Sequence, residues 1–165
     1  MKRLILILFV VSIVNSFAQT KLDYGIQFYH GTWKEACDKA KAENKLIFVD
    51  FYTQWCGPCL NMAENVFILP FIGDFYNTNF VNMKIDAENG EGVELAKRYG
   101  VNSYPTYVFV DPKNGDVVHR SKSRQEAEQF LATGKSALVP ELRSGYLIEE
   151  FAKGRDDREF LKNYI

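Results

Sequence analysis

Apolar runs and amphipathic segments alternate along the middle of the chain. Residues 46–52 and 106–110 are nearly continuous apolar runs rich in strand-forming residues, and residues 80–86 alternate apolar and polar positions. Each of these segments predicts a strand, and the first is expected to be covered on both faces. Apolar residues at helical spacing, with capping and breaking residues, predict helices between the strands. These helices are expected after Thr32, from Pro58 to Pro70, from Pro70 to about Asn77, over 92–99 and over 124–133.

The order of these elements predicts a mixed sheet. Strands separated by helices pair in parallel, whereas Asn114-Gly115 marks a hairpin turn that returns residues 116–120 as an antiparallel strand. We therefore expect an α/β fold with a mixed central sheet of four to five strands and helices on both faces. The residues of the Pro58 helix that are expected to face the core are Leu60, Ala63 and Phe67.

The first 18 residues differ from the rest of the chain. A basic start at residues 1–3 precedes an almost wholly apolar run over 4–14, and Ser16 and Ala18 place small residues at a cleavage site. This order is typical of a secretory signal peptide, so cleavage is expected after Ala18. A membrane anchor is the alternative, but the apolar run is shorter than the ~20 residues that span a bilayer. We expect residues 19–137 to form the main domain of an exported protein, located in the periplasm or outside the cell.

From Leu138 onward the pattern predicts a helical extension, residues 138–165, that the sheet does not need. One apolar stripe predicts a helix ended by Gly154, and a second follows a capping box of Asp156 and Glu159. The stripes comprise Leu142, Tyr146, Leu147 and Phe151, and then Phe160, Leu161 and Tyr164. Isolated helices this short are marginal in water. We therefore expect the extension to pack on the domain, or to begin a larger helical region completed by a missing segment or a partner.

Composition limits the functional classes. The chain has 165 residues, enough for one domain, and its 47% hydrophobic and 25% charged residues are ordinary for a globular protein. The net charge is −1 and no long basic run is present, which argues against nucleic acid as a partner. The sequence contains no NAD, flavin or metal motif, so no cofactor is expected beyond a redox-active disulfide.

The three cysteines favour redox chemistry over structural stapling. Cys56 and Cys59 are separated by two residues, and Cys37 stands alone on the apolar face of a predicted helix, where we expect it to be packed. Thiol–disulfide exchange needs an attacking thiolate and a second thiol that resolves the mixed disulfide. Cys56 would lie at a helix N-terminus, whose partial positive charge stabilises a thiolate, and Cys59 one turn inside the helix. We therefore predict that Cys56 attacks and Cys59 resolves.

Two plainer interpretations compete for this pair. The pair could be half of a zinc site, but zinc needs about four ligands, and Cys37, His30 and His119 offer no second pair. A purely structural disulfide that closes so short a loop would stabilise the fold little. Both histidines are expected to be surface residues, and the charged positions over 88–98 are expected to form a solvated helix face.

Two motifs carry a resemblance to a known family. The run from Val49-Asp50-Phe51 to Trp55-Cys56-Gly57-Pro58-Cys59 resembles thioredoxin, and residues 101–106 resemble that family's cis-proline loop. The resemblance covers residues 33–133. It is nearest to exported thioredoxin-like proteins, a subgroup that includes the C-terminal domain of the DsbD electron transporter.

The resemblance implies a role for each matching residue. Asp50 would be the buried acid that moves a proton to and from Cys59, and burial among apolar neighbours should raise its pKa. Trp55 would shield the redox pair, and Pro105 would be the cis-proline that faces it. The backbone of Tyr104 would pair with an extended substrate segment.

The sequence departs from the family at two places. Asn82 stands where thioredoxin has a lysine near the buried acid, with Lys84 two residues along the same strand face, so Asp50 is expected to lack a cationic partner. Ser103 stands in place of a usual glycine, and Tyr104 in place of a smaller aliphatic residue. We expect the second departure to alter substrate choice.

Three functions fit these features. A protein-disulfide reductase in an exported compartment is favoured, because Gly57-Pro58 between the cysteines resembles the reducing members of the family. The alternatives are a disulfide oxidase or isomerase, and a chaperone-like module that binds unfolded chains. An exported reductase ends each turnover with its cysteine pair oxidised, so the pair has to be reduced again by an electron donor. The expected partners are therefore disulfide-containing proteins and a membrane electron donor, with no metal.

Overall fold

The computed structural model of the chain describes residues 24–164. The signal peptide expected at residues 1–18 lies outside the described residues and stays a prediction. None of the helices within the described range combines the length and the apolarity that crossing a bilayer requires.

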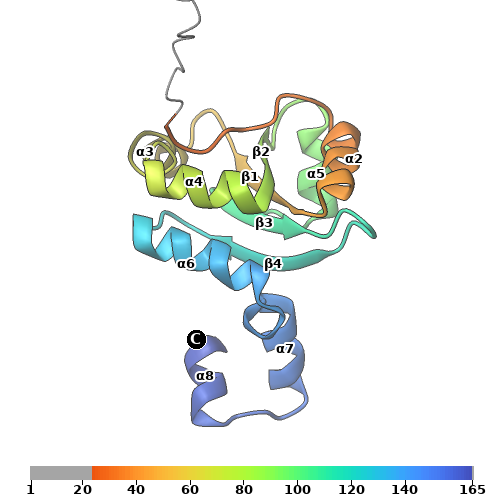
Figure 1. The fold of residues 1–165 in the computed structure, drawn as a ribbon, viewed down its shortest axis with the longest axis vertical. Coiled ribbons are helices and arrows are strands. Elements are labelled where there is room, and N and C mark those ends of the chain that lie inside the picture. The colour runs from red at the N-terminus through yellow and green to blue at the C-terminus, as the bar shows by residue number, and fades with distance from the viewer. Residues whose placement is uncertain (1–23, 165) are drawn as a thin grey trace, which may run out of the picture.

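A four-stranded sheet forms the centre of the fold (Figure 1). The strands are β1 (Leu46–Tyr52), β2 (Phe80–Asp86), β3 (Thr106–Val110) and β4 (Val117–Lys122), in the spatial order β2-β1-β3-β4. β1 pairs with β2 in parallel, whereas β3 is antiparallel to both β1 and β4, so the mixed sheet is confirmed. The segment before α2 runs outside β2, where Tyr29 N–H donates to the Asn82 carbonyl at 2.7 Å, but it adds no fifth strand.

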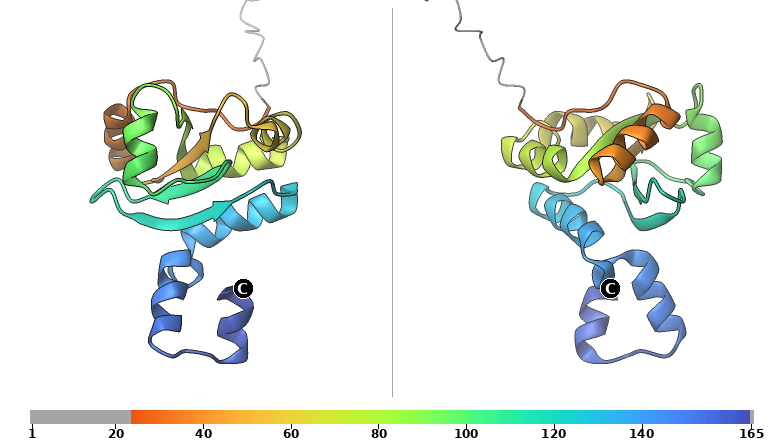
Figure 2. Two further views of the ribbon diagram at one scale, coloured as in Figure 1. Left: turned by 180° about the vertical axis from the view of Figure 1, so that it is seen from behind. Right: turned by 45° about the vertical axis from the view of Figure 1, so that its right-hand side comes forward.

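Helices of the described range cover both faces of the sheet. They are α2 (Trp33–Glu43), α3 (Gly57–Asn65), α4 (Pro70–Asn79), α5 (Gly92–Arg98) and α6 (Ala127–Leu138). α2 and α5 bury small and aliphatic side chains against one face, and α3, α4 and α6 pack on the other (Figures 1 and 2). Local signals set the starts: the Thr32–Glu35 capping box begins α2, and prolines lie in the first turns of α3 and α4.

Aromatic side chains fill the core beneath α3, α4 and α6. The ring of Phe48 on β1 lies 4.8 Å from that of Tyr76 and 5.8 Å from that of Phe130, centroid to centroid. Tyr76 and Phe130 stack at 4.6 Å with an interplanar angle of 5°, and the Tyr76 hydroxyl donates to the Phe130 carbonyl at 2.9 Å. Large buried rings contribute much of a core's apolar energy, so this cluster holds α4 and α6 to the sheet.

Two local predictions on the helices are corrected. Leu60 is 58% exposed and does not face the core, because α3 turns Cys59 and Met62 toward the sheet. Helix α6 begins at Ala127, three residues later than predicted, because the backbone of Glu126 is extended at φ −72° and ψ 159°.

The C-terminal extension packs on the edge strand β4. It consists of a 3₁₀ turn (Pro140–Leu142), α7 (Ser144–Ala152) and α8 (Arg158–Tyr164), which project from the core as a hairpin (Figure 2). Ser144 N–H donates to His119 Nδ1 at 3.0 Å, and Arg120 N–H donates to Ser144 Oγ at 2.9 Å. Leu147 of α7 is buried. Through α7, the extension therefore packs on the domain, whereas its completion by a further segment or a partner stays a prediction.

His119 and the start of α8 differ from the sequence predictions. His119 is buried under α7 and is not a surface residue. Burial, with the nearby charge of Arg143, lowers the pKa of His119 to about 4, so the neutral ring can accept the Ser144 N–H. Asp157, and not Asp156, caps α8, because its Oδ1 accepts Phe160 N–H at 2.9 Å. Both differences depend on where the chain turns back, which apolar spacing does not specify.

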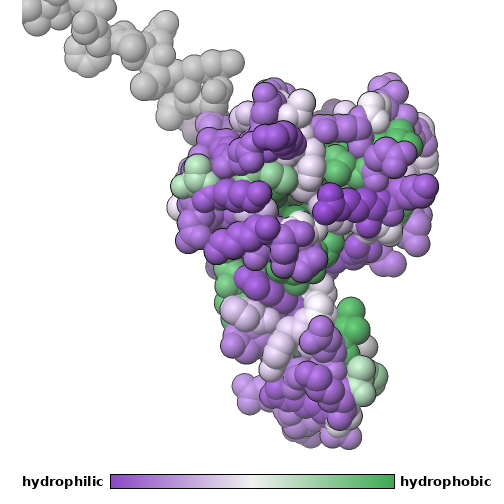
Figure 3. Space-filling model, turned by 90° about the vertical axis from the view of Figure 1, so that its right-hand side faces the viewer, coloured by the Kyte–Doolittle hydropathy of each residue, from purple (hydrophilic) through white to green (hydrophobic). Residues whose placement is uncertain are grey.

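Neighbouring apolar residues of α7 have opposite environments. Figure 3 shows a mainly hydrophilic face of the core, with apolar side chains gathered along one side of the extension. Leu147 is 6% exposed, whereas Ile148 is 59% exposed. Comparison of these two residues therefore distinguishes the effect of burial where α7 meets β4 from the effect of apolar side chains on α7 in general.

We predict that Leu147→Ala lowers the free energy of unfolding by about 2–3 kcal/mol, because a buried aliphatic side chain is lost where α7 meets β4. Ile148→Ala is the matched control, with an expected change below about 0.5 kcal/mol. Urea denaturation followed by tryptophan fluorescence reports the core, since both tryptophans lie outside the extension. A core transition that Leu147→Ala leaves unmoved would show that the extension unfolds separately.

Candidate active site

Cys56 and Cys59 form a disulfide at the N-terminus of α3. The S–S distance is 1.99 Å, and both residues are almost fully buried. Cys56 is the N-cap of the helix, and its Sγ accepts the Cys59 N–H at 3.1 Å. Unpaired N–H groups and the helix dipole favour negative charge at this position. The local geometry therefore suits a thiolate at Cys56 once the disulfide is reduced.

Asp50 lies on β1, on the face of the sheet that α3 covers. Its side chain is 1% exposed, and neither carboxyl oxygen has a hydrogen-bond partner among the described residues. Burial raises the pKa of Asp50 to about 7, and the positive charge of Lys84 opposes that rise. The carboxyl can therefore gain and lose a proton near neutral pH, as a general base for a thiol requires.

Among the described residues, Asp50 has no cationic partner in direct contact, as expected, although Lys84 lies beside it on the neighbouring strand. The two residues are paired in register on neighbouring parallel strands, so their side chains leave the same face of the sheet. The Lys84 ammonium lies 4.8 Å from the centroid of the Tyr52 ring, and it makes no hydrogen bond to Asp50. Lys84 thus acts on the carboxyl through its charge and not through a direct contact.

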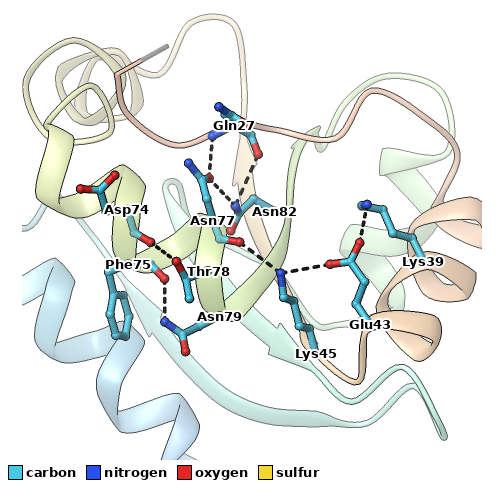
Figure 4. Close-up of polar contacts among 10 residues, drawn as sticks. All are labelled: Gln27, Lys39, Glu43, Lys45, Asp74, Phe75, Asn77, Thr78, Asn79 and Asn82. Atoms are coloured by element: carbon cyan, nitrogen blue, oxygen red, sulfur yellow. Dashed lines mark hydrogen bonds and ion pairs between the residues drawn. The ribbon is translucent and has the colours of Figure 1, made fainter. Parts of the chain in front are cut away.

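Asn82, at the position of the family's lysine, belongs to a polar network at the edge of the sheet (Figure 4). Its Nδ2 donates to Asn77 Oδ1 at 3.0 Å, and Gln27 N–H donates to the same oxygen at 2.8 Å. Lys45 Nζ donates to the Asn77 carbonyl at 3.2 Å. The network ties the segment before α2 to α4 and β2, so the Asn82 amide is engaged in holding this edge together.

The loop before β3 meets the residue that precedes the cysteine pair. The Tyr104–Pro105 peptide bond is cis, as the resemblance implies, and Pro105 is buried. The rings of Trp55 and Tyr104 lie edge to face, with centroids 6.0 Å apart and an interplanar angle of 81°. Because Trp55 directly precedes Cys56, this contact brings the cis-proline loop beside the disulfide.

Trp55 has a second contact, which sequence reasoning missed. Its Nε1–H donates to Glu88 Oε2 at 2.9 Å across 33 positions of sequence. Glu88 was expected on a solvated helix face, but it lies in the turn after β2, and α5 begins only at Gly92. No local pattern pairs residues so far apart, so this contact had no signal in the sequence.

A cavity of about 210 Å³ opens beside the disulfide. It is bordered by Tyr52, Trp55, Cys59 and Lys84, so solvent and small polar groups can approach the redox pair there. Cys37, by contrast, is half-buried on α2, and burial raises the pKa of its thiol. Within residues 24–164, no three His, Cys, Asp or Glu side chains are grouped as metal ligands.

Comparison with known proteins agrees with this geometry. A family model described as a thioredoxin-like domain matches residues 33–138. The solution structure of a Bacteroides thetaiotaomicron protein proposed to be a disulphide isomerase is 42% identical, with a TM-score of 0.63, over 70% of this chain and 95% of its own. The oxidised C-terminal domain of Neisseria meningitidis DsbD shares the fold at 24% identity and a TM-score of 0.55, over 67% of this chain and 99% of that one.

Curated relatives match the part of the chain around the cysteines. Thioredoxin-1 of Drosophila yakuba is 46% identical over 69 residues, which are 42% of this chain and 60% of the fly protein. The match thus spans about 60% of that relative's length. The family model spans well over half of the present chain and includes the cysteine pair, Asp50 and the cis-proline loop. The chain therefore belongs to the thioredoxin-like family, and the Cys56–Cys59 disulfide is its redox-active centre.

Proposed function

We propose that the protein is an exported protein-disulfide reductase that works by dithiol–disulfide exchange. The observation that carries the proposal is the place of Cys56 at the N-terminus of α3, where its sulfur accepts the Cys59 N–H. That environment stabilises the thiolate that exchange requires. Asp50 lies buried on the strand that leads into this turn and is the candidate proton acceptor.

The proposed reaction has two steps. The Cys56 thiolate attacks one sulfur of the substrate disulfide, forms a mixed disulfide and expels the other substrate sulfur as a thiolate. Asp50 then takes the proton of the Cys59 thiol, and the Cys59 sulfur attacks Cys56 Sγ. The mixed disulfide breaks, the second substrate thiolate leaves, and the two electrons given to the substrate are balanced by formation of the Cys56–Cys59 disulfide.

We assign substrate binding to the surface next to Cys56. Trp55 offers an exposed aromatic face, and Tyr104 and Pro105 lie in the loop that contacts it. An extended chain could pair with the Tyr104 backbone in the manner of an added strand. Gly57 and Pro58 shape the turn between the two cysteines.

The direction of exchange is tested by the reduction potential of the Cys56–Cys59 pair. The Gly57-Pro58 spacer supports a reductant. A potential below about −230 mV, toward the thioredoxin value, would support the reductase, whereas a potential near or above about −180 mV would indicate an isomerase or oxidase. Equilibration with glutathione buffers, read by thiol alkylation, gives this number directly.

A disulfide isomerase is the second candidate. The 42% identity to a Bacteroides protein proposed to be a disulphide isomerase favours it. An isomerase would restore activity to scrambled ribonuclease without net reduction. A chaperone-like module, by contrast, would still suppress aggregation after both Cys56 and Cys59 are replaced by serine.

Export and recharging belong to the same proposal. Residues 1–18 have the pattern of a signal peptide, and a reductase beyond the cytoplasmic membrane needs an electron donor that reaches across it. Fusion of residues 1–23 to alkaline phosphatase tests export, since that reporter gains activity only in an oxidising compartment. An inactive fusion would contradict export.

We predict opposite behaviour for the two cysteines. Cys56→Ser abolishes reduction of insulin disulfides, because the attacking sulfur is lost. Cys59→Ser accumulates mixed disulfides through Cys56, which appear as dithiothreitol-sensitive adducts by mass spectrometry. Cys37→Ser, a change at the half-buried thiol of α2, is the control and retains activity. Normal turnover by Cys59→Ser would refute the assignment of roles.

We predict that Asp50→Asn removes a pH dependence of stability. The folded pKa of Asp50, about 7, lies above the ordinary value of 3.8, so between these pH values the folded protein holds a proton that the unfolded chain has lost. The wild type therefore loses stability as the pH rises from about 4 to about 7, by up to roughly 4 kcal/mol. Denaturation at pH 5 and pH 8 should show that Asp50→Asn is the more stable protein at pH 8.

The same substitution should slow resolution of the mixed disulfide, because the Cys59 thiol loses its proton acceptor. Stopped-flow decay of the mixed disulfide between pH 6 and pH 9 measures this step. Asp74→Asn, which removes an exposed carboxylate of α4, is the control with wild-type kinetics. Equal rates for Asp50→Asn and wild type across this range would refute the proton-transfer role.

A further inference from the structure

Trp55 is held at two points although most of it faces solvent. The residue is 70% exposed, yet its indole N–H donates to Glu88 Oε2 at 2.9 Å. Its ring also lies edge to face with the Tyr104 ring, with centroids 6.0 Å apart. An exposed tryptophan without such contacts would sample several rotamers. The two contacts therefore select one orientation of the indole next to Cys56.

The turn that presents Glu88 is itself organised by Asp86. One oxygen of the Asp86 carboxylate accepts Glu88 N–H at 3.0 Å, and the other accepts Asn89 Nδ2 at 2.6 Å and Gln54 Nε2 at 3.3 Å. Gln54 directly precedes Trp55 in the chain. The turn after β2 and the turn before α3 are thus joined by two side-chain hydrogen bonds, one from each of two consecutive residues.

We propose that Glu88 is a positioning residue for substrate binding: its carboxylate holds the Trp55 indole against Tyr104 and so preshapes the surface on which a substrate chain docks. The turn after β2, Trp55 and the loop before β3 then form one continuous wall beside Cys56. This inference rests on the proposed function, because it assigns substrate docking to that wall.

The expected effect is on substrate affinity and not on the chemistry. Within the described residues, Glu88 makes no hydrogen bond to either sulfur. Its role is to restrict the rotamers of the Trp55 side chain, which a substrate would otherwise have to immobilise. Loss of one hydrogen bond at an exposed site should raise KM for a protein substrate about two- to tenfold with kcat nearly unchanged.

The test compares Glu88→Ala, Glu88→Gln, Trp55→Phe and the double variant Trp55→Phe/Glu88→Ala. Glu88→Gln keeps an oxygen acceptor without the charge, and Trp55→Phe keeps a ring without the N–H donor. Glu94→Ala removes an equal charge from an exposed position of α5 and serves as the charge control. The readouts are KM and kcat for insulin reduction, and the rate of reduction of the Cys56–Cys59 disulfide by dithiothreitol, which is too small to need the wall.

The proposal expects KM to rise in Glu88→Ala, to stay near wild type in Glu88→Gln and Glu94→Ala, and not to rise further when Glu88→Ala is added to Trp55→Phe. The dithiothreitol rate should stay unchanged in Glu88→Ala, Glu88→Gln and Glu94→Ala. An unchanged KM in Glu88→Ala overturns the proposal, as does a Glu88→Gln variant as impaired as Glu88→Ala. A further rise of KM in the Trp55→Phe background overturns it too, since Glu88 would then act without the indole.

A readout that needs no turnover separates this proposal from the proposed function. The indole N–H of Trp55 gives a nuclear magnetic resonance signal that is identified by its loss in Trp55→Phe. It should shift and exchange faster with water in Glu88→Ala but not in Glu88→Gln. A wild type that reduces no disulfide refutes the reductase, whereas an indole signal that Glu88→Ala leaves unchanged refutes the positioning role.

Discussion

Tyr76 of α4 stacks on Phe130 of α6, a residue 54 positions away in the sequence, and this contact fixes both helices over one face of the sheet. Phe48 of β1 packs against both rings, so strand and helices share one aromatic core. Asp50 leaves the same face two residues further along β1. The packing that stabilises the domain therefore also removes water from the carboxyl, and this burial in the core raises the pKa of Asp50.

Two opposing electrostatic effects then set the state of Asp50. Desolvation favours the neutral acid, because neither oxygen finds a hydrogen bond among the described residues. The charge of Lys84, in register on β2, favours the carboxylate, but burial is the larger effect. The balance near neutral pH suits an acid that exchanges a proton with a thiol. An ion pair in direct contact would have held the carboxylate charged and made it a poor base.

Both edge strands of the sheet, β2 and β4, are partly covered by segments outside the sheet. At β2, the segment before α2 is tied to the sheet by the amides of Asn77 and Asn82. At β4, Ser144 exchanges hydrogen bonds with His119 and Arg120, so that α7 covers part of an otherwise free edge. Exposed strand edges favour association with other chains, and both segments reduce that exposure.

Much of this protein was determined by its sequence alone. The apolar run over β1, the alternation over β2 and the Asn114-Gly115 turn predict the strands because side-chain burial has a period that the backbone imposes. The spacing of Cys56 and Cys59 around a helix start predicts their chemistry for the same local reason. Both inferences need only neighbours within a turn or a strand.

Tertiary structure alone decided the contacts between distant segments. The burial of His119, the pairing of Trp55 with Glu88 and the register of Lys84 with Asp50 each join residues from separate elements. Leu60 was misplaced because several residues of a helix are apolar and only packing selects the face that is buried. Periodicity specifies which residues share a face, whereas the energy of packing one element on another determines which face meets the core.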